Sequence, residues 1–444
     1  MRTAVVLFTR DLRVHDHPAL AAACAVAEHV VPLFVLDPAL LGRSANRDRF
    51  LHQALADLRA GLRERGADLV VRRGDTVAET IAVARAAGAD GIAVSHDVSR
   101  FATRRQERLR AEADRHRMSL RLFPGVTVLP PGEVSPGGGG GHYRVFSPYF
   151  RAWESAALRD EAAPPQRIAP LPDAGALGVA LPEPPKGESP DAAEGGETEG
   201  RRRLTAWLRH IDAYDDQHDA MADDDTSRLS AYLRFGCLSP LAVVNAARRQ
   251  GGPGAAAFVR QLCWRDFYYQ VTAGFPDISR KPMRPSGDRD WRYDAHALEA
   301  WQSGRTGVPI VDAGMRQLMA EGWMHNRARL ITAALLTKHL RCDWRDGQAW
   351  FFRWLIDGDV ANNSGNWQWV AGTGNDTRPH RRFNPIRQAQ RYDPEGDYVR
   401  RYVPELAGIP GPAVHQPWRL DGFERLDYPP PLESHGDEAV WLRP

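Results

Sequence analysis

The sequence predicts an α/β domain built on a doubly wound parallel sheet, followed by an all-α domain. Short apolar runs alternate with Ala-, Arg- and Glu-rich stretches through the first 130 residues. Residues 161–200 then hold eight prolines among many Gly, Glu and Ala, which is the composition of a linker. From residue 201 onward the apolar spacing is helical, and no convincing strand is found. We therefore expect an α/β domain over 1–130, an interdomain linker over 131–203 and a helical domain over 204–444.

The first domain is defined by its alternating elements. Apolar runs rich in β-branched residues predict strands at 4–8, 30–36, 69–72, 91–95 and 120–123. Helical stretches lie near 18–28, 46–65, 76–88 and 100–117. Such alternation is typical of a parallel sheet covered on both faces. The first strand–helix turn, residues 8–13, lacks G-x-G-x-x-G, so the usual dinucleotide fingerprint is absent, although this fold class still favours a ligand at the carboxyl ends of the strands.

Two apolar series at helical spacing support the second domain. They are Leu204, Trp207, Leu208 and Ile211, and Met324, Ala328, Ile331 and Leu335. The five-glycine run 137–141 predicts a flexible loop. A phosphate-cradling loop is the alternative, but no strand-to-helix context surrounds the run.

Composition excludes several classes of protein. The 444 residues exceed one compact core, and 43% hydrophobic with 26% charged residues argues against global disorder. No apolar run reaches 18 residues, and the chain runs directly into an apparent strand at 4–8, so we expect neither a membrane span nor a signal peptide. The four cysteines form no C-x-x-C pair, so we expect no metal site, no disulfide framework and a cytoplasmic location.

Local charge is more informative than the net charge of +2. Residues 378–402 contain seven arginines but only three acidic residues. Such a stretch is either a solvated basic face or a surface that meets phosphates.

Two short constellations have both a structural and a functional interpretation. Residues 225–230 combine an acid with hydroxyls before an apolar turn, which predicts either a helix N-cap or an anion site. Residues 264–269, preceded by Gln261, are aromatic and contain Arg265. They are either core with a surface charge or a platform on which a base stacks.

Two further constellations combine Arg and Asp. In residues 322–330, Asn326 and Leu330 share a helix face and Arg327 lies beside it, while His325 is expected to be structural. A buried Arg needs an acid, and Asp357 or Asp359 could supply it. Residues 357–369 are small, polar and acidic, then abruptly aromatic, so a ligand-binding role is favoured over a core role.

These motifs together resemble the DNA photolyase/cryptochrome family, most closely its class I cyclobutane pyrimidine dimer photolyases. The matching pieces of the helical FAD domain are T-S-R-L-S (226–230), W-R-D-F (264–267), G-W-M-H-N-R (322–327), D-G-D (357–359) and N-W-Q-W (366–369). R-D-L-R (10–13) and Y-R-V-F-S-P-Y (143–149) are similar to the family's antenna domain and its exit.

The resemblance implies that the helical domain binds FAD. The residues implied near the diphosphate are Tyr214, Thr226, Ser227, Arg228, Leu229 and Ser230. Those implied around the flavin are Arg329 paired with Asp357, then Gly358, Asp359 and Asn363. Asn363 would lie against flavin N5, where an amide, which cannot readily supply a proton, favours the fully reduced anion FADH⁻.

The resemblance also implies an activity, light-driven repair of cyclobutane dimers in UV-damaged DNA by an electron from excited FADH⁻. The dimer is flipped out of the duplex. Trp264 would stack on it, Asn326 and Arg327 would line its pocket, and Gln261, Gln388 and the 378–401 stretch would contact DNA. Trp367, Trp344 and Trp291, in that order from the flavin, match an electron chain to the surface. The alternative interpretation of the chain is three core aromatics.

Three departures from the family pattern concern the lesion pocket. Gln261 stands where Glu is common, His218 where Arg is common, and Leu330 where Met is frequent. The histidines typical of (6-4) photolyases are absent at Asn326 and Leu330, which favours the cyclobutane dimer. The alternative functions are a blue-light receptor of the cryptochrome branch and a DNA-binding module without chemistry. A monomer is expected.

The resemblance implies a second chromophore in the antenna domain. Arg49, Asp97 and Arg234 match positions that contact 8-hydroxy-5-deazaflavin, which is therefore favoured over methenyltetrahydrofolate. The alternative for Arg49 and Arg234 is surface charge.

Overall fold

The computed structural model confirms the predicted fold class. It describes residues 1–137, 141–223, 225–285, 291–375 and 383–432. The strands are β1 (Thr3–Phe8), β2 (His29–Leu36), β3 (Val70–Arg73), β4 (Gly91–Ser95) and β5 (Ser119–Phe123). All pair in parallel in the order β3-β2-β1-β4-β5. Every residue of β1 is buried, as expected for a central strand covered on both faces.

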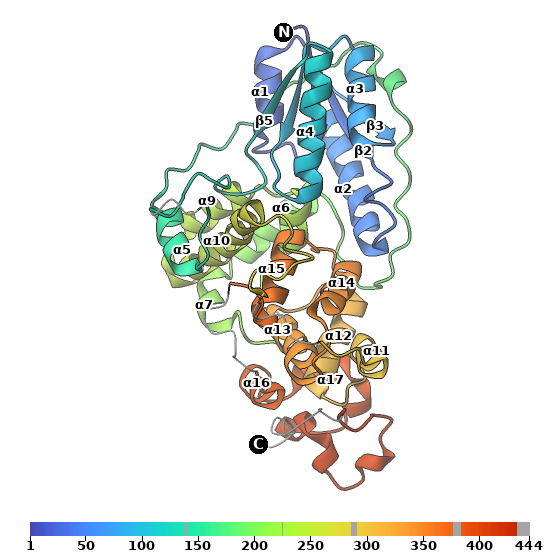
Figure 1. Cartoon of the computed structure of the whole chain (residues 1–444), viewed down its shortest axis with the longest axis vertical. Coiled ribbons are helices and arrows are strands. Elements are labelled where there is room, and N and C mark those ends of the chain that lie inside the picture. The colour runs from blue at the N-terminus through green and yellow to red at the C-terminus, as the bar shows by residue number, and fades with distance from the viewer. Residues whose placement is uncertain (138–140, 224, 286–290, 376–382, 433–444) are drawn as a thin grey trace. The chain divides into compact units, whose positions relative to one another are not determined.

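Helices cover both faces of this sheet (Figure 1). They are α1 (Pro18–Val26), α2 (Ala45–Arg63), α3 (Thr76–Ala86) and α4 (Arg100–Arg115). Each begins at a residue whose side chain accepts a backbone N–H, namely His17, Ser44, Asp75 and Ser99. The strand order reverses between β1 and β4, so the loops that follow these two strands form the ligand-binding edge typical of such sheets.

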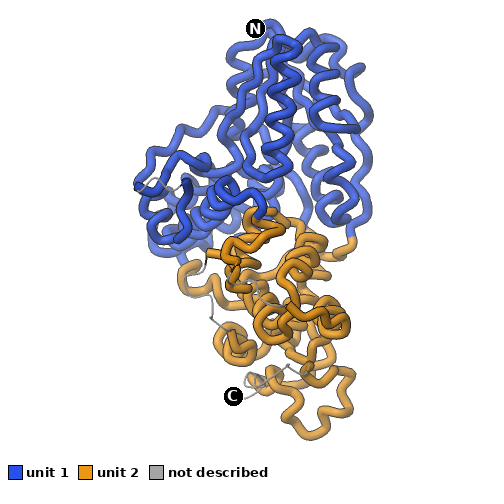
Figure 2. The backbone as a smooth tube through the Cα atoms, in the orientation of Figure 1, with its two compact units in different colours: residues 1–187, 193–212, 227–277 blue, residues 188–192, 213–226, 278–444 orange. Residues whose placement is uncertain are grey.

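The described chain divides into two compact units, which Figure 2 colours separately. Unit 1 comprises residues 1–187, 193–212 and 227–277, and unit 2 comprises 188–192, 213–226 and 278–444. Besides the sheet, unit 1 holds α5 (Phe146–Ser155), α6 (Glu197–Leu208), α8 (Ser230–Phe235), α9 (Pro240–Gln250) and α10 (Gly252–Gly274). The sequence predicted three consecutive domains, 1–130, 131–203 and 204–444, whereas each compact unit is made of several separate segments. The two units therefore do not test these domain boundaries, which stay a prediction.

The described part of unit 2 contains helices and no strand. Its helices are α7 (Tyr214–Gln217), α11 (Ala295–Ser303), α12 (Pro309–Glu321), α13 (Asn326–Ala334), α14 (Trp344–Trp354), α15 (Val360–Ala371), α16 (Pro385–Tyr392) and α17 (Asp397–Tyr402). A π-helical turn, Leu335–His339, follows α13. The apolar series at Met324, Ala328, Ile331 and Leu335 is buried in the core of this unit, although α13 begins only at Asn326.

Two negative findings apply to the residues that the structure describes. None of their helices combines the length and apolar character that crossing a membrane would need. They also contain no group of three His, Cys, Asp or Glu side chains able to hold a metal ion.

Candidate cofactor and nucleic-acid site

A charged pair in unit 2 joins α13 to the loop before α15. Arg329 donates from Nη2 to Asp357 Oδ2 at 2.8 Å and from Nη1 to Oδ1 at 3.2 Å. Its Nε donates to the carbonyl of Met324 at 2.8 Å. Such a fork-shaped pairing fixes geometry as well as charge. The ion pair implied by the family resemblance is therefore present, and it holds the buried Asp357 and Gly358 against α13.

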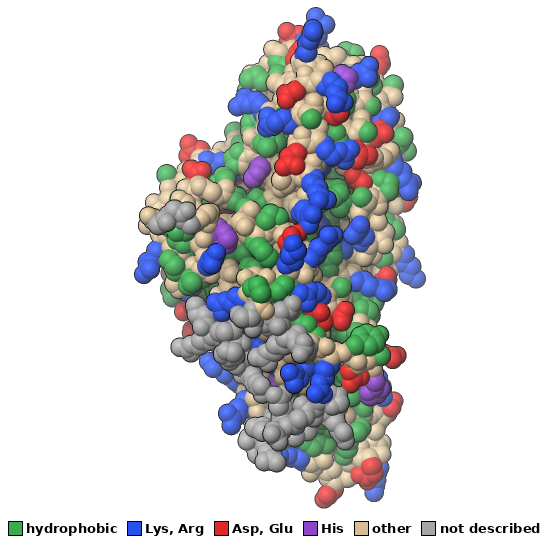
Figure 3. Space-filling view, viewed as in Figure 1, with side chains coloured by type: hydrophobic (Ala, Val, Ile, Leu, Met, Phe, Trp, Pro, Cys, Tyr) green, Lys and Arg blue, Asp and Glu red, His purple; other side chains and the backbone are tan. Residues whose placement is uncertain are grey.

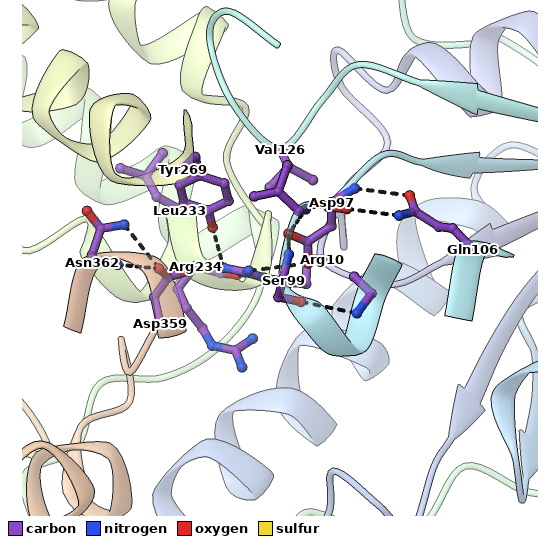
Figure 4. Close-up of polar contacts among 12 residues, drawn as sticks. Arg10, Asp97, Ser99, Gln106, Val126, Leu233, Arg234, Tyr269, Asp359 and Asn362 are labelled. Carbon is purple, nitrogen blue, oxygen red and sulfur yellow. Dashed lines mark hydrogen bonds and ion pairs between the residues drawn. The ribbon is translucent and has the colours of Figure 1, made fainter. Parts of the chain in front are cut away.

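The start of α15 fixes two side chains of the expected flavin set. Asp359 is the N-cap, and its Oδ1 accepts from the backbone N of Asn362 at 2.8 Å and from its Nδ2 at 3.1 Å (Figure 4). One residue further, Asn363 donates from Nδ2 to the carbonyl of Gln348 at 3.1 Å. One of the two N–H groups of the half-buried Asn363 amide is engaged there, so its second N–H and its oxygen are the groups available to a ligand.

The same helix carries Trp367, which is 2% exposed. The ring of Trp367 packs directly on the backbone of α14, because a Cβ at Gly347 would lie 2.2 Å from its Cη2. Phe351 and Trp301 also contact the ring, with centroids 4.9 and 6.0 Å away.

Trp344 begins α14, one turn before Gly347, and is fully buried. Trp291 is half-buried. Its neighbour Arg292 donates from its backbone N to the carbonyl of Arg341 at 2.9 Å and forms an isolated bridge with Cys342. Trp344 and Trp367 belong to one buried core cluster of unit 2, and the half-buried Trp291 packs against that cluster.

The segment 226–230 is not the side-chain cap that one interpretation of the sequence predicted. Helix α8 begins at Ser230 with Leu229 as its N-cap, and no side chain bonds to the helix end. Arg228 has φ 49°, which turns the chain sharply, and Ser227 Oγ accepts from the N of Leu229 at 3.4 Å. The buried hydroxyls of Thr226 and Ser230 have no hydrogen-bond partner in the described protein.

Unpartnered buried hydroxyls point to a ligand, since each costs about 1–3 kcal/mol when left unsatisfied. Two donors on one short segment fit the oxygens of a diphosphate, so these residues fit the phosphate part of FAD. Tyr214, expected nearby, is half-buried on α7, and burial raises the pKa of its phenol above the usual range. Its carbonyl accepts from Nδ1 of His218 at 2.7 Å.

The residues expected to contact DNA in unit 2 lie around the start of α13. Asn326 is exposed at the first helical position. His325 is the N-cap, accepting the backbone N–H of Arg327 at Nδ1, and burial lowers the pKa of its imidazole to about 4. His325 is therefore a structural residue that is neutral at neutral pH. Gln388 lies half-buried on α16.

Arg327 has an acidic partner that sequence reasoning did not identify. Its guanidinium pairs with Asp219 through two hydrogen bonds and lies 4.5 Å from the ring centroid of Tyr392. The acids Asp357 and Asp359 are engaged by other residues. No motif in the sequence marks Asp219, because it is one of several acids between 212 and 225.

The structure shows what some of the arginines in the basic stretch 378–402 contact. Arg378, Arg381 and Arg382 lie outside the described residues. Arg400 pairs with Asp397 and donates to the carbonyls of Glu395 and Ile409, so its charge serves the fold. The same unit holds a cavity of about 470 Å³, which Arg391 and Tyr392 line together with six acids. The acids are Asp216, Asp219, Asp223, Asp393, Glu395 and Asp397. Residues 391–397 are thus a poor surface for phosphates, whereas Arg387 and Arg401 are exposed.

In unit 1, α10 carries the remaining DNA candidates. Gln261 is exposed, and Trp264 is half-buried with its ring stacked on Phe146. The rest of the W-R-D-F motif is structural. Asp266 accepts from Val128 N, Leu129 N and Trp153 Nε1 at 2.9–3.0 Å, and burial raises its pKa to about 6.

Two of the three expected antenna residues, Asp97 and Arg234, are connected through Arg10, which the sequence marked only as part of a motif. Arg10 donates from Nε to the carbonyl of Arg234 at 3.2 Å and from Nη2 to the hydroxyl of Tyr269 at 2.6 Å, and its Nη1 lies 3.5 Å from Asp97 Oδ2 (Figure 4). Arg10 thus bridges the carboxylate of Asp97 and the backbone carbonyl of Arg234. Arg49 lies half-buried on α2 with its side chain near Gly187, and no contact joins it to this cluster.

The same edge of the sheet holds unpartnered polar atoms. Arg105, on α4, is 8% exposed, and its Nε and Nη2 have no hydrogen-bond partner in the described protein. The hydroxyl of Thr9, directly after β1, is also buried and unpartnered. A buried cationic donor of this kind is costly unless a ligand satisfies it. Sequence reasoning missed Arg105 because it is one of seven arginines in the expected helical stretch 100–117.

Comparisons with known proteins agree with this arrangement. Residues 4–170 match the family model described as DNA photolyase, and residues 258–439 match the FAD binding domain of DNA photolyase. The chain is 52% identical to the deoxyribodipyrimidine photo-lyase of Streptomyces griseus, over 97% of this chain and 96% of that protein. It is 36% identical to the photo-lyase of Escherichia coli, over 99% and 97%, and 36% identical to the cryptochrome DASH of Natronomonas pharaonis, over 96% and 95%.

Solved structures show the same relationship. The bacterial class III photolyase from Agrobacterium tumefaciens superposes with a TM-score of 0.89 at 32% identity, covering 98% of this chain and 95% of that one. The Synechocystis cryptochrome superposes with a TM-score of 0.89 at 30% identity, covering 97% and 96%. An archaeal photolyase from Sulfolobus tokodaii with two FAD molecules reaches 0.82 at 29%, covering 97% and 96%. The chain therefore belongs to the DNA photolyase family.

Proposed function

We propose that this protein repairs cyclobutane pyrimidine dimers in DNA in a light-dependent reaction. The observation that carries the proposal is the arrangement on α15, where Asn363 and Trp367 lie one turn apart. A residue suited to a flavin and the first residue of an electron chain thus share one rigid helix. When bound, reduced FAD supplies the excited electron that opens the cyclobutane ring.

The chain's own groups would hold and tune that cofactor. Thr226 and Ser230 would donate their unpartnered hydroxyls to the diphosphate, while Ser227, Arg228 and Leu229 shape the turn. The Arg329–Asp357 pair and the Asp359 cap would keep the flavin-facing loop in place. The oxygen of Asn363 would accept from an N5–H, which is present in the reduced flavin and absent in the oxidised one. This arrangement favours the reduced form.

The tryptophan series would return the cofactor to its working state. Trp367 is buried, Trp344 lies one helical turn from the Gly347 contact, and Trp291 is partly exposed. Indole is among the more easily oxidised side chains, so an electron can pass inward along the three rings. The series recharges the cofactor, and repair by protein that is already reduced does not require it.

The side chains proposed to contact damaged DNA are exposed or half-buried. Trp264 offers a ring to a flipped base, and Gln261 offers an exposed amide that donates and accepts hydrogen bonds. Asn326 offers a second exposed amide, and Arg327, paired with Asp219, follows it on the helix. Gln388 with the exposed Arg387 and Arg401 would contact the strand.

A second chromophore would bind at the carboxyl edge of the sheet, near Asp97 and Arg234. The unpartnered atoms of Arg105 and Thr9 support a ligand there. We favour 8-hydroxy-5-deazaflavin over methenyltetrahydrofolate, with Arg49 as a further contact. The absorption spectrum after incubation with each compound distinguishes them. A cytoplasmic monomer stays our expectation.

The test is loss of thymine dimers from a defined duplex, using chemically reduced protein under blue light with a dark control. We expect loss in light and none in the dark. A blue-light receptor is the second candidate, since relatives are named cryptochromes and Gln261 replaces the usual Glu. Protein that carries FAD and photoreduces, but leaves the dimers intact, would favour the receptor.

A further inference from the structure

The segment 143–149 carries no role in the function proposed above, although it is one of the motifs singled out in the sequence. In the structure it leads into α5 and forms its first turn, and the segment and α5 together are held on α10 at three points. Gln270 accepts from the backbone N of Tyr143 at 2.9 Å and donates to its carbonyl at 2.8 Å. At the other end of α5, Trp153 donates from Nε1 to Asp266 at 3.0 Å.

The third point is a ring stack between these two clamps. Phe146 lies parallel to Trp264, with ring centroids 3.7 Å apart and an interplanar angle of 5°. Phe146 is 5% exposed, whereas Trp264 is half-buried. The other ring contacts of Trp264 are with Phe267 at 86° and Tyr268 at 6.0 Å, both within one turn on α10.

A parallel, face-to-face arrangement at this distance is not the preferred geometry of two unconstrained aromatic rings. Offset and edge-to-face arrangements are preferred, because two electron-rich faces repel. Here the backbone clamps impose the geometry. The guanidinium of Arg260 lies 5.3 Å from the centroid of Phe146, and a cation draws electron density from that ring.

We propose that Phe146 is a positioning residue for lesion recognition, which fixes the plane of Trp264 so that its opposite face can receive a flipped pyrimidine. This inference rests on the proposed function, in which Trp264 stacks on the dimer. The physical benefit is preorganisation. Without a ring stacked on it, the indole of Trp264 would have to be ordered when DNA binds. Immobilising one such side chain costs enough to weaken binding about two- to twelvefold.

Two variants test the role of the ring at this position. Phe146→Leu removes the aromatic face while it keeps an apolar side chain, and Phe146→Tyr keeps the face. Phe150→Leu is the matched control, because Phe150 stacks on Phe146 and contacts Arg260, but it has no ring contact with Trp264.

The first readout needs neither DNA nor light. In protein labelled with 5-fluorotryptophan, the ¹⁹F resonance of Trp264 is assigned by its disappearance in Trp264→Phe. We expect it to shift and broaden in Phe146→Leu, and to keep its position in Phe146→Tyr and Phe150→Leu. An unchanged resonance in Phe146→Leu would overturn the proposal, whatever the protein does to DNA.

The second readout is the ratio of the dissociation constants for undamaged and dimer-containing duplex, measured in the dark. We expect Phe146→Leu to lower this ratio two- to twelvefold, Phe146→Tyr to restore it, and Phe150→Leu to leave it unchanged. In a Trp264→Ala background, Phe146→Leu should lower it no further. An equal additional loss there would mean that Phe146 acts by supporting α5 generally, and would refute a role through Trp264.

The two readouts separate this inference from the proposed function. If the parent protein shows no preference for damaged duplex while the ¹⁹F resonance responds as described, the proposed function fails and the control of Trp264 by Phe146 stands. If the parent protein prefers damaged duplex and Phe146→Leu keeps the full preference, the inference fails and the function stands.

Discussion

Replacing Gly347 by alanine tests the contact between α14 and Trp367, on which the proposed electron chain depends. The added Cβ would lie 2.2 Å from Trp367 Cη2 and 2.6 Å from a methyl carbon of Leu336. Ordinary contact needs about 3.5–4.0 Å between carbon atoms, so the indole must move by more than 1 Å. It would move away from α14, and therefore away from the helix that carries Trp344.

The stability effect combines two opposing contributions. Alanine in a helix interior gains about 1 kcal/mol over glycine, while overpacking a filled core costs about 1–3 kcal/mol. We expect the free energy of unfolding to fall by about 0–2 kcal/mol. The larger effect falls on electron transfer, because the spacing of the first two tryptophans changes.

The assay is the rate at which oxidised flavin is reduced under blue light with an external thiol donor, in preparations matched for FAD content. Gly347→Ala should slow this photoreduction, and Trp367→Phe should slow it further. Gly408→Ala is the control, because a Cβ there meets no atom within 4 Å. A Gly347→Ala protein with unchanged photoreduction and unchanged stability would refute the placement of Trp367 against α14.

Three further predictions follow from individual side chains. Thr226→Val and Ser230→Ala should each lower FAD affinity roughly 10–100-fold by removing a hydrogen bond to a charged group, with little change in the stability of the apoprotein, because neither hydroxyl has a protein partner. Calorimetric titration of the apoprotein measures this, and equal loss of apoprotein stability would contradict it. Burial raises the pKa of Asp266 to about 6, above its usual value, so the folded state binds its proton more tightly and this group adds stability as the pH falls from about 7 to 4. Asp266→Asn keeps an acceptor for the three donors, and the difference in unfolding free energy between parent and variant should therefore change by about 2–3 kcal/mol across that range. A pH-independent difference in urea titrations would be the contrary result. Asn326→Ala should weaken binding to dimer-containing duplex more than binding to undamaged duplex, and equal weakening in filter-binding assays would make Asn326 a general DNA contact.

The fold was predictable because its signals are periodic and local. All five strands lie within one residue of their expected bounds, and the four helices between them start within one residue of theirs. The buried series at Met324, Ala328, Ile331 and Leu335 was also foreseen, although the helix starts later than that series. His325 caps the helix, so Met324 is buried from the preceding turn.

The site was predictable where a motif carried it. The Arg329–Asp357 pair, which the structure contains, was implied by the family resemblance. Asp219, Arg10 and Arg105 were missed because their roles come from contacts across 87 to 259 residues of chain, or from burial that no local pattern signals. The cap interpretation at 226–230 failed for a related reason. Hydroxyls before a helix signal a cap, and a ligand site uses the same residue types.

The most direct test of the account compares repair by reduced and by oxidised protein. Dimer loss from a defined duplex under blue light is measured for the parent protein and for Trp367→Phe, each prepared in both redox states. Chemically reduced samples of the two proteins should repair equally well and show no loss in the dark, while starting from oxidised flavin only the parent protein should gain activity in light. Failure of the reduced parent protein to remove dimers would contradict the proposed repair function. Equal loss of repair in reduced Trp367→Phe would contradict the assignment of the tryptophans to recharging the cofactor.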